Sequence, residues 1–372
     1  MNKRVLIALP NDSLGGAEQY LKLVAQELLS YGYKVDVFFL KKKVSCAWED
    51  LKSCNVTLNY TESVTEKSGV LSMVNSISRN RHVFYDYVFT SHIHTNSLLG
   101  LLRKIRILNC KYLIGRESTS AFLRFTGLKL FVFKCMYLTG YFNLDLLICQ
   151  SSLMKHQLVN ALPSLASKIL IEVLPNPVNL DFIKKKAEHC FGLDEVMQER
   201  CIVSAGRLID EKGFDVLISA FKLVKIVEPN LKLVILGEGA NRASLSNQIE
   251  KLNLTTDVCL LGFTENVYPY FKTAILCVVS SRIEGFPNVL LQMMSQNTKV
   301  VSTKCAGGIE DIPGIFLAEP NDVVSLSSAI QVALATDTRD NKKAFDIELC
   351  DRSIKRFLTK INEIVEAELI SS

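Results

Sequence analysis

The sequence lacks the long apolar segments that mark membrane-spanning and secreted proteins. A membrane-spanning helix requires roughly 18 uncharged apolar residues, and the best candidate, residues 130–149, is interrupted by Lys134 and Asp145. The first apolar run, Val5 to Leu9, is too short for the core of a signal peptide and is typical of a first strand. We therefore expect neither a secretion signal nor a membrane-spanning helix.

The cysteines lack the spacing of a metal site. There are eleven, scattered along the chain, and no Cys-x-x-Cys occurs. Cys149, Cys201 and Cys277 lie inside apolar runs, where cysteine usually behaves as a small buried hydrophobe. This usage favours a reduced, cytosolic setting over a disulfide framework.

Two common ligand-binding motifs are also missing where they would be expected. The turn after the first apolar run, PNDSLGGAE, is not the G-x-G-x-x-G dinucleotide motif. No Asp-x-Asp pair, which could hold a divalent metal, follows a predicted strand. The sequence therefore predicts no metal site.

What is present is the composition of an ordinary globular protein. With 372 residues, 48% hydrophobic and 22% charged, the chain is long enough for two domains. Residues 1–180 carry 21 Lys and Arg against 12 Asp and Glu, whereas residues 181–372 carry 22 against 26. A basic half and a mildly acidic half suggest different tasks.

Apolar strand patterns alternate with helical patterns in both halves, which predicts an α/β fold. We expect two doubly wound Rossmann-like domains of comparable size that face each other: residues 1–180, residues 181–349, and a C-terminal helix at about 350–372 that packs back on the first. The hinge is predicted at EVLPNPVNLD, Glu172 to Asp181, because its prolines stop regular structure. Residues 41–80 have no clear pattern.

Three strand-to-helix turns carry candidate ligand-binding residues, since ligands bind at the carboxyl ends of parallel strands. In the first, Gly15 and Gly16 precede a helix whose N–H groups could bind an anion, although such a turn often needs glycine for its geometry alone. In GRLIDEKG, Arg207 and Lys212 suit a diphosphate, with a solvated surface pair as the alternative.

The third turn is RIEGFPNVLLQ, Arg282 to Gln292. Pro287 is predicted at the first helical position, behind an exposed Phe286, so that nearby N–H groups point at a ligand. Glu284 would repel phosphate and more naturally accepts hydrogen bonds from sugar hydroxyls. Gln292, two turns further, could face the same ligand.

These motifs, together with LGEG, LLGF, GGAE and PNPVNLD, resemble glycosyltransferase family 4, retaining enzymes of GT-B fold, over most of the chain. The resemblance implies a nucleotide-sugar donor, with a UDP-linked one favoured, and no cofactor. It implies that Glu284 holds the transferred sugar, while Arg207 and Lys212 bind the diphosphate. The implied donor-binding residues are Gly15, Gly16, Arg207, Lys212, Phe263, Gly285, Phe286, Pro287, Asn288, Val289 and Gln292.

Two departures from the family pattern affect the site. Gln292 stands where the family usually has a second glutamate that reaches the ribose. In place of a histidine near the reacting sugar, the matching turn reads IGRES, so that Glu117 becomes a candidate catalytic residue together with His94 of TSHIHTN. His92 and His94 could also form a structural pair. Metal binding is a further alternative, but no carboxylate or cysteine partner is evident near them in the sequence.

The acceptor is expected to be a glycan, polyprenyl-pyrophosphate-linked, in bacterial-type surface polysaccharide synthesis. The segment FLRFTGLKLFVFKCMYLTGYF interleaves seven aromatic residues with three cations, which suits an anionic membrane surface, although an ordinary core helix is an alternative. We expect a cytoplasmic protein, peripheral on the membrane, that binds no nucleic acid. The alternatives are a nucleotide-sugar epimerase or phosphorylase on the same fold, or a non-catalytic nucleotide-sugar-binding relative.

Overall fold

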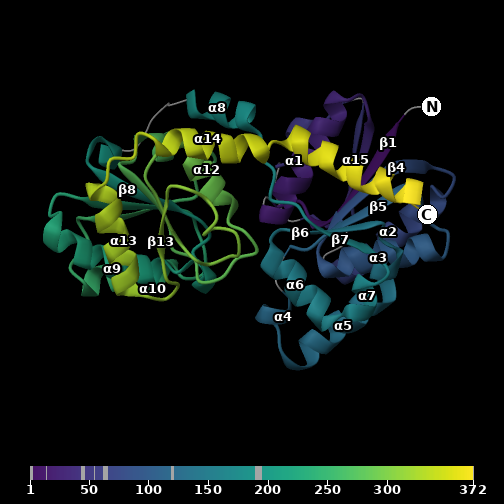
Figure 1. Ribbon diagram of the computed structural model, residues 1–372, viewed down its shortest axis with the longest axis horizontal. Helices are drawn as coiled ribbons and strands as arrows, with labels where there is room; N and C mark the ends of the chain where they lie inside the picture. The colour runs from purple at the N-terminus through teal and green to yellow at the C-terminus, as the bar shows by residue number, and fades with distance from the viewer. Residues whose placement is uncertain are drawn as a thin grey trace. The chain divides into compact units, whose positions relative to one another are not determined.

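The structure is a computed structural model that describes residues 3–13, 15–42, 47–53, 55–61, 66–118, 121–188 and 195–371. The chain forms two compact units (Figure 1). Unit 1 comprises Met1–Pro177 and Ile354–Ser372, and unit 2 comprises Val178–Ser353. The chain therefore leaves unit 1, completes unit 2 and returns to unit 1 for its last helix.

Unit 1 is built on a seven-stranded sheet in the order β3-β2-β1-β4-β5-β6-β7, with every pairing parallel. The order reverses between β1 and β4, where Val5 lies beside Val35 on one side and Tyr87 on the other. The strands are β1 (Arg4–Asn11), β2 (Lys34–Lys41), β3 (Val56–Tyr60), β4 (Phe84–Ser91), β5 (Asn109–Arg116), β6 (Leu146–Cys149) and β7 (Leu170–Val173).

Helices cover the sheet of unit 1, and one of them comes from the far end of the chain. The helix α15 (Ile354–Ser371) contributes Phe357, Leu358 and Ile361 to the same buried cluster as β1 and α1. Tyr20 packs edge-on against Phe357, with ring centroids 5.4 Å apart. The other helices are α1 (Gly16–Ser30), α2 (Glu66–Arg79), α3 (Ile93–Lys104), α4 (Ala121–Arg124), α5 (Gly127–Gly140), α6 (Ser152–Ala161) and α7 (Pro163–Ala166).

Unit 2 repeats this arrangement with a six-stranded parallel sheet, β10-β9-β8-β11-β12-β13. Its order reverses between β8 and β11. The strands are β8 (Cys201–Ala205), β9 (Lys232–Leu236), β10 (Val258–Gly262), β11 (Leu276–Val279), β12 (Val300–Thr303) and β13 (Ile315–Ala318). The helices are α8 (Leu180–Glu188), α9 (Phe214–Val227), α10 (Arg242–Lys251), α11 (Tyr268–Thr273), α12 (Asn288–Gln296), α13 (Val323–Ala335) and α14 (Asn341–Asp351).

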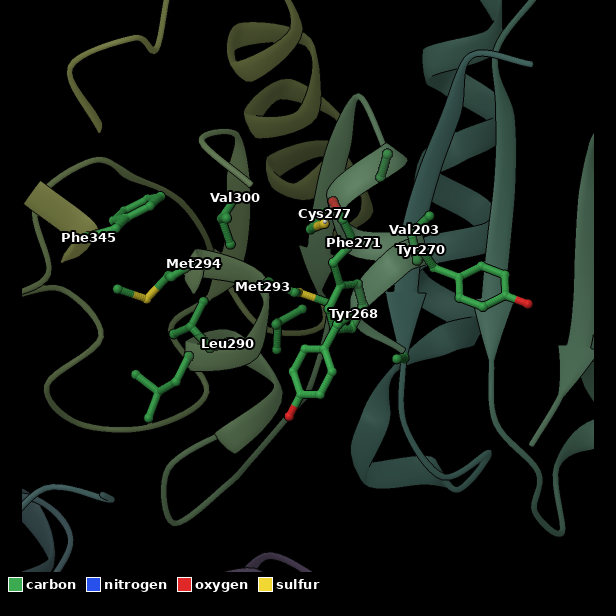
Figure 2. Packing of buried hydrophobic residues seen from close by; sticks show 14 of the residues in the cluster. Val203, Tyr268, Tyr270, Phe271, Cys277, Leu290, Met293, Met294, Val300 and Phe345 are labelled. Carbon is green, nitrogen blue, oxygen red and sulfur yellow. Dashed lines mark hydrogen bonds between the residues drawn. The ribbon is translucent and has the colours of Figure 1, made fainter. Parts of the chain in front are cut away.

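The core of unit 2 fixes the helix that follows β11. Apolar residues of α12 recur at helical spacing, so Leu290, Met293 and Met294 share one face, which is buried. Figure 2 shows this face among Val300, Cys277 and Phe345. Burial of these side chains holds the start of α12 at the carboxyl edge of the sheet, next to the RIEGFP turn.

The two parallel-sheet domains predicted from the alternating pattern are confirmed. The segment without a clear pattern contains β3 and α2 among its described residues, and the short strands β7 and β13 were not anticipated. The hinge residues Pro177 and Val178 separate the units. The chain passes between the units twice, before Val178 and after Ser353, and these two points lie side by side. Val178 donates a hydrogen bond to the carbonyl of Arg352 over 2.8 Å and forms a β-bridge with Ser353.

Candidate functional site

The reversal of strand order in unit 2 places two loops at one edge of the sheet. In open parallel sheets, ligands bind where the order reverses, at the carboxyl ends of the strands. The loops that follow β8 and β11 meet there, and Ser280 Oγ donates a hydrogen bond to the carbonyl of Lys212 over 2.9 Å. The predicted diphosphate and sugar loops are therefore neighbours in space.

An ion pair lies at the centre of this edge. The Nζ of Lys212 contacts Oε1 of Glu284, and Ser281 Oγ donates to the same oxygen over 2.9 Å. The two charged side chains are 18% and 20% exposed, respectively, so both can be reached from solvent. The backbone N–H of Glu284 donates to the carbonyl of Cys305 over 2.8 Å, which fixes the carboxylate's attachment point. Lys212 and Glu284, predicted from separate motifs, are in direct contact.

Arg282 holds the two loops together, a role that its local sequence does not predict. Its Nη2 contacts Oδ2 of Asp215 over 2.6 Å, and its backbone N–H donates to the carbonyl of Glu211 over 2.8 Å. The hydrogen bond with Asp215 raises the pKa of Arg282. The sequence shows only that an arginine stands two residues before Glu284. It does not show the partners of this arginine, Asp215 and Glu211, which are about 70 residues away in the chain.

Two glycines allow the loops to approach closely. Gly213 has a φ of +61°, and a Cβ there would clash with the carbonyl of Ser280. Gly237, in the predicted LGEG turn, has a φ of +140°, and a Cβ would clash with the carbonyl of Gly206. The backbone of this edge is therefore packed too tightly for side chains at either position.

Arg207 and Phe263 are both available to a ligand. Arg207 is exposed, and its guanidinium pairs with no side chain in the part of the chain that the structure describes. Phe263, just after β10, is 76% exposed. An exposed cation after β8 and an exposed ring after β10, the two strands that flank β9, fit a phosphate and a base, respectively.

The turn from Gly285 to Val289 differs from the expectation at two residues. Phe286 is 7% exposed rather than at the surface, and the guanidinium of Arg352 lies 4.7 Å from its ring centre. Pro287 is the N-cap of α12 and not its first helical residue. Phe286 is therefore a core anchor of the turn, while Gly285, Asn288 and Val289 are half-buried.

Gln292 contacts a tyrosine at the edge of the buried cluster. Its Nε2 lies 3.4 Å from the hydroxyl of Tyr268, whose ring packs in the cluster of Figure 2. Burial raises the pKa of Tyr268 to about 12. The glutamine side chain is half-buried, so it keeps polar atoms for a ligand.

Unit 1 has a polar cluster at its own reversal point. Gly15 is the N-cap of α1, and the nearby carboxylate of Glu18, which is buried, lies 3.8 Å from Nε2 of His92. His92 has a φ of +82°, an uncommon backbone conformation for a residue other than glycine. His94 is half-buried, with its ring centre 6.0 Å from that of His92. Glu18 was missed because a first-turn glutamate usually serves the helix end.

Glu117, predicted as a catalytic residue, has a different position. It is 2% exposed, and Tyr137 and Tyr141 donate hydrogen bonds to its two carboxylate oxygens over 2.7 and 3.0 Å. Burial raises the pKa of Glu117 to about 7. The neighbouring Arg116 is also buried and donates to Asn176. Glu117 is therefore buried and anchors α5 to the end of β5, and its catalytic role stays a prediction.

The described residues provide neither a metal-binding cluster nor a membrane-spanning helix. Among the residues with described positions, no group of three or more His, Cys, Asp or Glu side chains could hold a metal ion. No helix within those same residues has both the length and the apolar character needed to cross a bilayer.

The comparisons with known proteins agree with this geometry. Residues 185–345 match the family model described as glycosyl transferases group 1. The matched stretch is a domain similar to group 1 glycosyltransferases. This domain contains the Lys212–Glu284 pair and both loops at the edge of the unit 2 sheet. The predicted family resemblance is confirmed.

Curated relatives match part of the chain. An uncharacterized glycosyltransferase of Methanocaldococcus jannaschii is 30% identical over 235 residues, 61% of this chain and 57% of the relative. The N-acetylgalactosamine-N,N'-diacetylbacillosaminyl-diphospho-undecaprenol 4-alpha-N-acetylgalactosaminyltransferase of Campylobacter jejuni is 32% identical over 200 residues, 50% of this chain and 53% of the relative. The alignments therefore span little more than half of these relatives' lengths.

A solved structure confirms the GT-B fold over nearly the whole chain. HepE of Anabaena, solved in complex with UDP and glucose, superposes with a TM-score of 0.77 at 18% identity. The match covers 98% of this chain and 100% of that one.

Proposed function

We propose that this protein is a retaining glycosyltransferase that transfers a sugar from a nucleotide-sugar donor to a glycan acceptor. The observation that carries the proposal is the contact between Lys212 and Glu284 at the reversal point of unit 2. A lysine cation at this position suits a donor diphosphate, and a carboxylate beside it suits the hydroxyls of the attached sugar.

The pair also fits the charges that develop during transfer. The departing diphosphate gains negative charge, which Lys212 and the exposed Arg207 would stabilise. The sugar becomes oxocarbenium-like, and the carboxylate of Glu284 favours that positive charge over the neutral ground state. The two cations supply electrostatic stabilisation at the leaving group, so the proposal includes no resident metal.

The donor and acceptor are narrower parts of the same proposal. A UDP-linked hexose or N-acetylhexosamine is supported by the fold match to HepE, which was solved with UDP and glucose. The exposed Phe263 would contact the base, and Gln292 would contact the ribose. The name of the Campylobacter jejuni relative specifies a diphospho-undecaprenol-linked glycan, which supports a lipid-linked acceptor in surface polysaccharide synthesis at the cytoplasmic membrane face.

The test begins with a thermal-shift screen of nucleoside diphosphates and nucleotide sugars. One nucleotide should stabilise the wild-type protein and the Lys222→Ala control, an exposed lysine of the same unit, but not Lys212→Ala. The matching nucleotide sugar should be consumed when a polyprenyl-diphosphate-linked glycan is added, and proton NMR should show that the anomeric configuration is retained. Binding without consumption of any donor would instead favour a non-catalytic nucleotide-sugar-binding protein.

A further inference from the structure

Helix α5 carries a continuous apolar stripe that faces solvent. Leu128 is 79% exposed, Phe131 62%, Val132 42% and Leu138 42%. Together with the exposed Cys135, these positions follow helical spacing (128, 131, 132, 135 and 138), so they lie along one side of the helix. Large apolar side chains that are exposed singly are common, but four on one face of a single helix indicate a contact surface.

The opposite side of α5 is fully occupied. The helix packs on α3, where the backbones of Gly100 and Gly140 approach so closely that a Cβ on Gly100 would clash with the carbonyl of Gly140. Tyr137 is buried and bonded to Glu117. Figure 1 shows α5 at the outer edge of unit 1, on the far side of α3 from the sheet. The stripe is therefore held outward by a rigid inner face.

The charged residues of the segment that carries the stripe all have one sign. Residues 121–143 contain no Asp or Glu, but they contain Arg124, Lys129 and Lys134. Arg124 and Lys129 are exposed, and Lys129 Nζ lies 4.1 Å from the ring centre of Phe125. A surface that combines an apolar stripe with cations matches the boundary between anionic lipid headgroups and acyl chains.

We propose that α5 docks on an anionic bilayer, with Leu128, Phe131, Val132 and Leu138 inserted at the acyl boundary and Arg124 and Lys129 among the lipid phosphates. With 14 residues, the helix is shorter than the roughly 20 that would span the bilayer, so it lies in the interface plane. A second copy of the chain fits less well, because a two-fold contact through this stripe would bring like charges together. The docking of α5 is inferred from its own side chains. Only the link between docking and a lipid-linked acceptor rests on the proposed function.

Co-sedimentation with vesicles tests the docking. Wild-type protein should bind vesicles of phosphatidylcholine with 30% phosphatidylglycerol and bind pure phosphatidylcholine poorly, and this binding should weaken with salt. The double variant Leu128→Gln/Phe131→Gln should bind at least about tenfold more weakly, since each side chain loses its apolar burial. The matched control Leu71→Gln, an exposed leucine on α2 of the same unit, should bind like wild type.

A fluorescence experiment locates the inserted face. Trp48 is the only tryptophan and is buried, so a Phe131→Trp variant in a Trp48→Phe background reports on one site. Its emission should shift to the blue with anionic vesicles, whereas Leu71→Trp in the same background should not shift. Equal shifts at both positions, or unchanged vesicle binding by Leu128→Gln/Phe131→Gln, would overturn the proposal. So would a dimer, seen by light scattering, that the same double variant converts to monomer.

The outcome can be separated from that of the proposed function. Hydrolysis of a soluble nucleotide sugar in vesicle-free buffer should be the same for wild type and the double variant, because α5 carries none of the donor-binding residues. Donor hydrolysis by a wild-type protein that ignores vesicles would remove this inference and leave the proposed function intact. Vesicle binding through α5 without any donor turnover would do the reverse.

Discussion

The contact between Lys212 and Glu284 leads to a quantitative prediction for nucleotide binding. The lysine that we assign to the donor diphosphate is paired with Glu284 in the structure. Nucleotide binding must therefore compete with the carboxylate for the Lys212 ammonium. Glu284→Gln keeps the shape of the side chain but removes this competing charge. Because both side chains are about one-fifth exposed, we take an interaction of ~1 kcal/mol, the upper end for solvent-screened pairs.

From that value, Glu284→Gln should bind the free nucleoside diphosphate about fivefold more tightly than wild type. Its rate of sugar transfer should nevertheless fall by about 10²–10³-fold, the scale of losing one preorganised electrostatic contact to the transition state. Lys212→Met should weaken nucleotide binding by ~2 kcal/mol, about 30-fold, because a charge-assisted hydrogen bond is lost. In Glu284→Gln, nucleotide affinity thus rises while the transfer rate falls. In Lys212→Met, nucleotide affinity and transfer rate fall together.

Isothermal titration calorimetry on a double-mutant cycle provides the assay. In the Lys212→Met background, Glu284→Gln should no longer tighten nucleotide binding, since the lysine that it releases is absent. Lys222→Met serves as the control for loss of a surface charge. The reasoning would be refuted if Glu284→Gln weakened nucleotide binding while turnover stayed intact, because Glu284 would then be a ribose or structural ligand.

Three further predictions concern metal, pH and backbone geometry. Transfer should persist in excess chelator, and activity that is lost there and restored by magnesium or manganese would contradict the role given to Lys212 and Arg207. Because burial raises the pKa of Glu117 from its ordinary value of 4.5 to about 7, the folded state retains a proton that the unfolded state releases, so the free energy of unfolding should fall by up to ~3 kcal/mol as the pH rises through this window. Urea titrations should show that Glu117→Gln flattens this slope, and an unchanged slope would assign the pH dependence elsewhere. Gly213→Ala should lower stability by ~1–3 kcal/mol and weaken nucleotide binding, because a Cβ at φ +61° clashes with the Ser280 carbonyl; near-wild-type melting and binding would count against a rigid loop contact.

Local patterns were sufficient to predict the fold and to select the two charged residues that meet in the candidate site. Strand and helix periodicity recovered two parallel sheets because each buried strand is a short apolar run and each helix shows one apolar face. Lys212 and Glu284 could be selected because charged residues directly after buried strands have few structural reasons to be there. Their direct contact depends on the strand order, which periodicity does not specify.

The remaining residues depend on partners that lie far away in the sequence. Glu117 looked available because it follows a strand, yet Tyr137 and Tyr141 come from a helix and loop further along and bury it. Phe286 looked exposed between Gly285 and Pro287, but Arg352, at the end of α14, covers its ring. Tertiary contacts of this kind override local turn chemistry, and no window of sequence around either residue contains them.

The return of α15 to unit 1 has a consequence for protein synthesis. Residues 1–177 emerge from the ribosome with the surface that receives Phe357, Leu358 and Ile361 still uncovered, and it stays uncovered until all of unit 2 has been translated. The first half of the nascent chain must therefore wait as an incomplete intermediate that exposes apolar surface to chaperones. A premature stop codon just before residue 354 would spare the whole group 1 domain, yet it would leave the other unit with an open core and make the product a substrate for proteases.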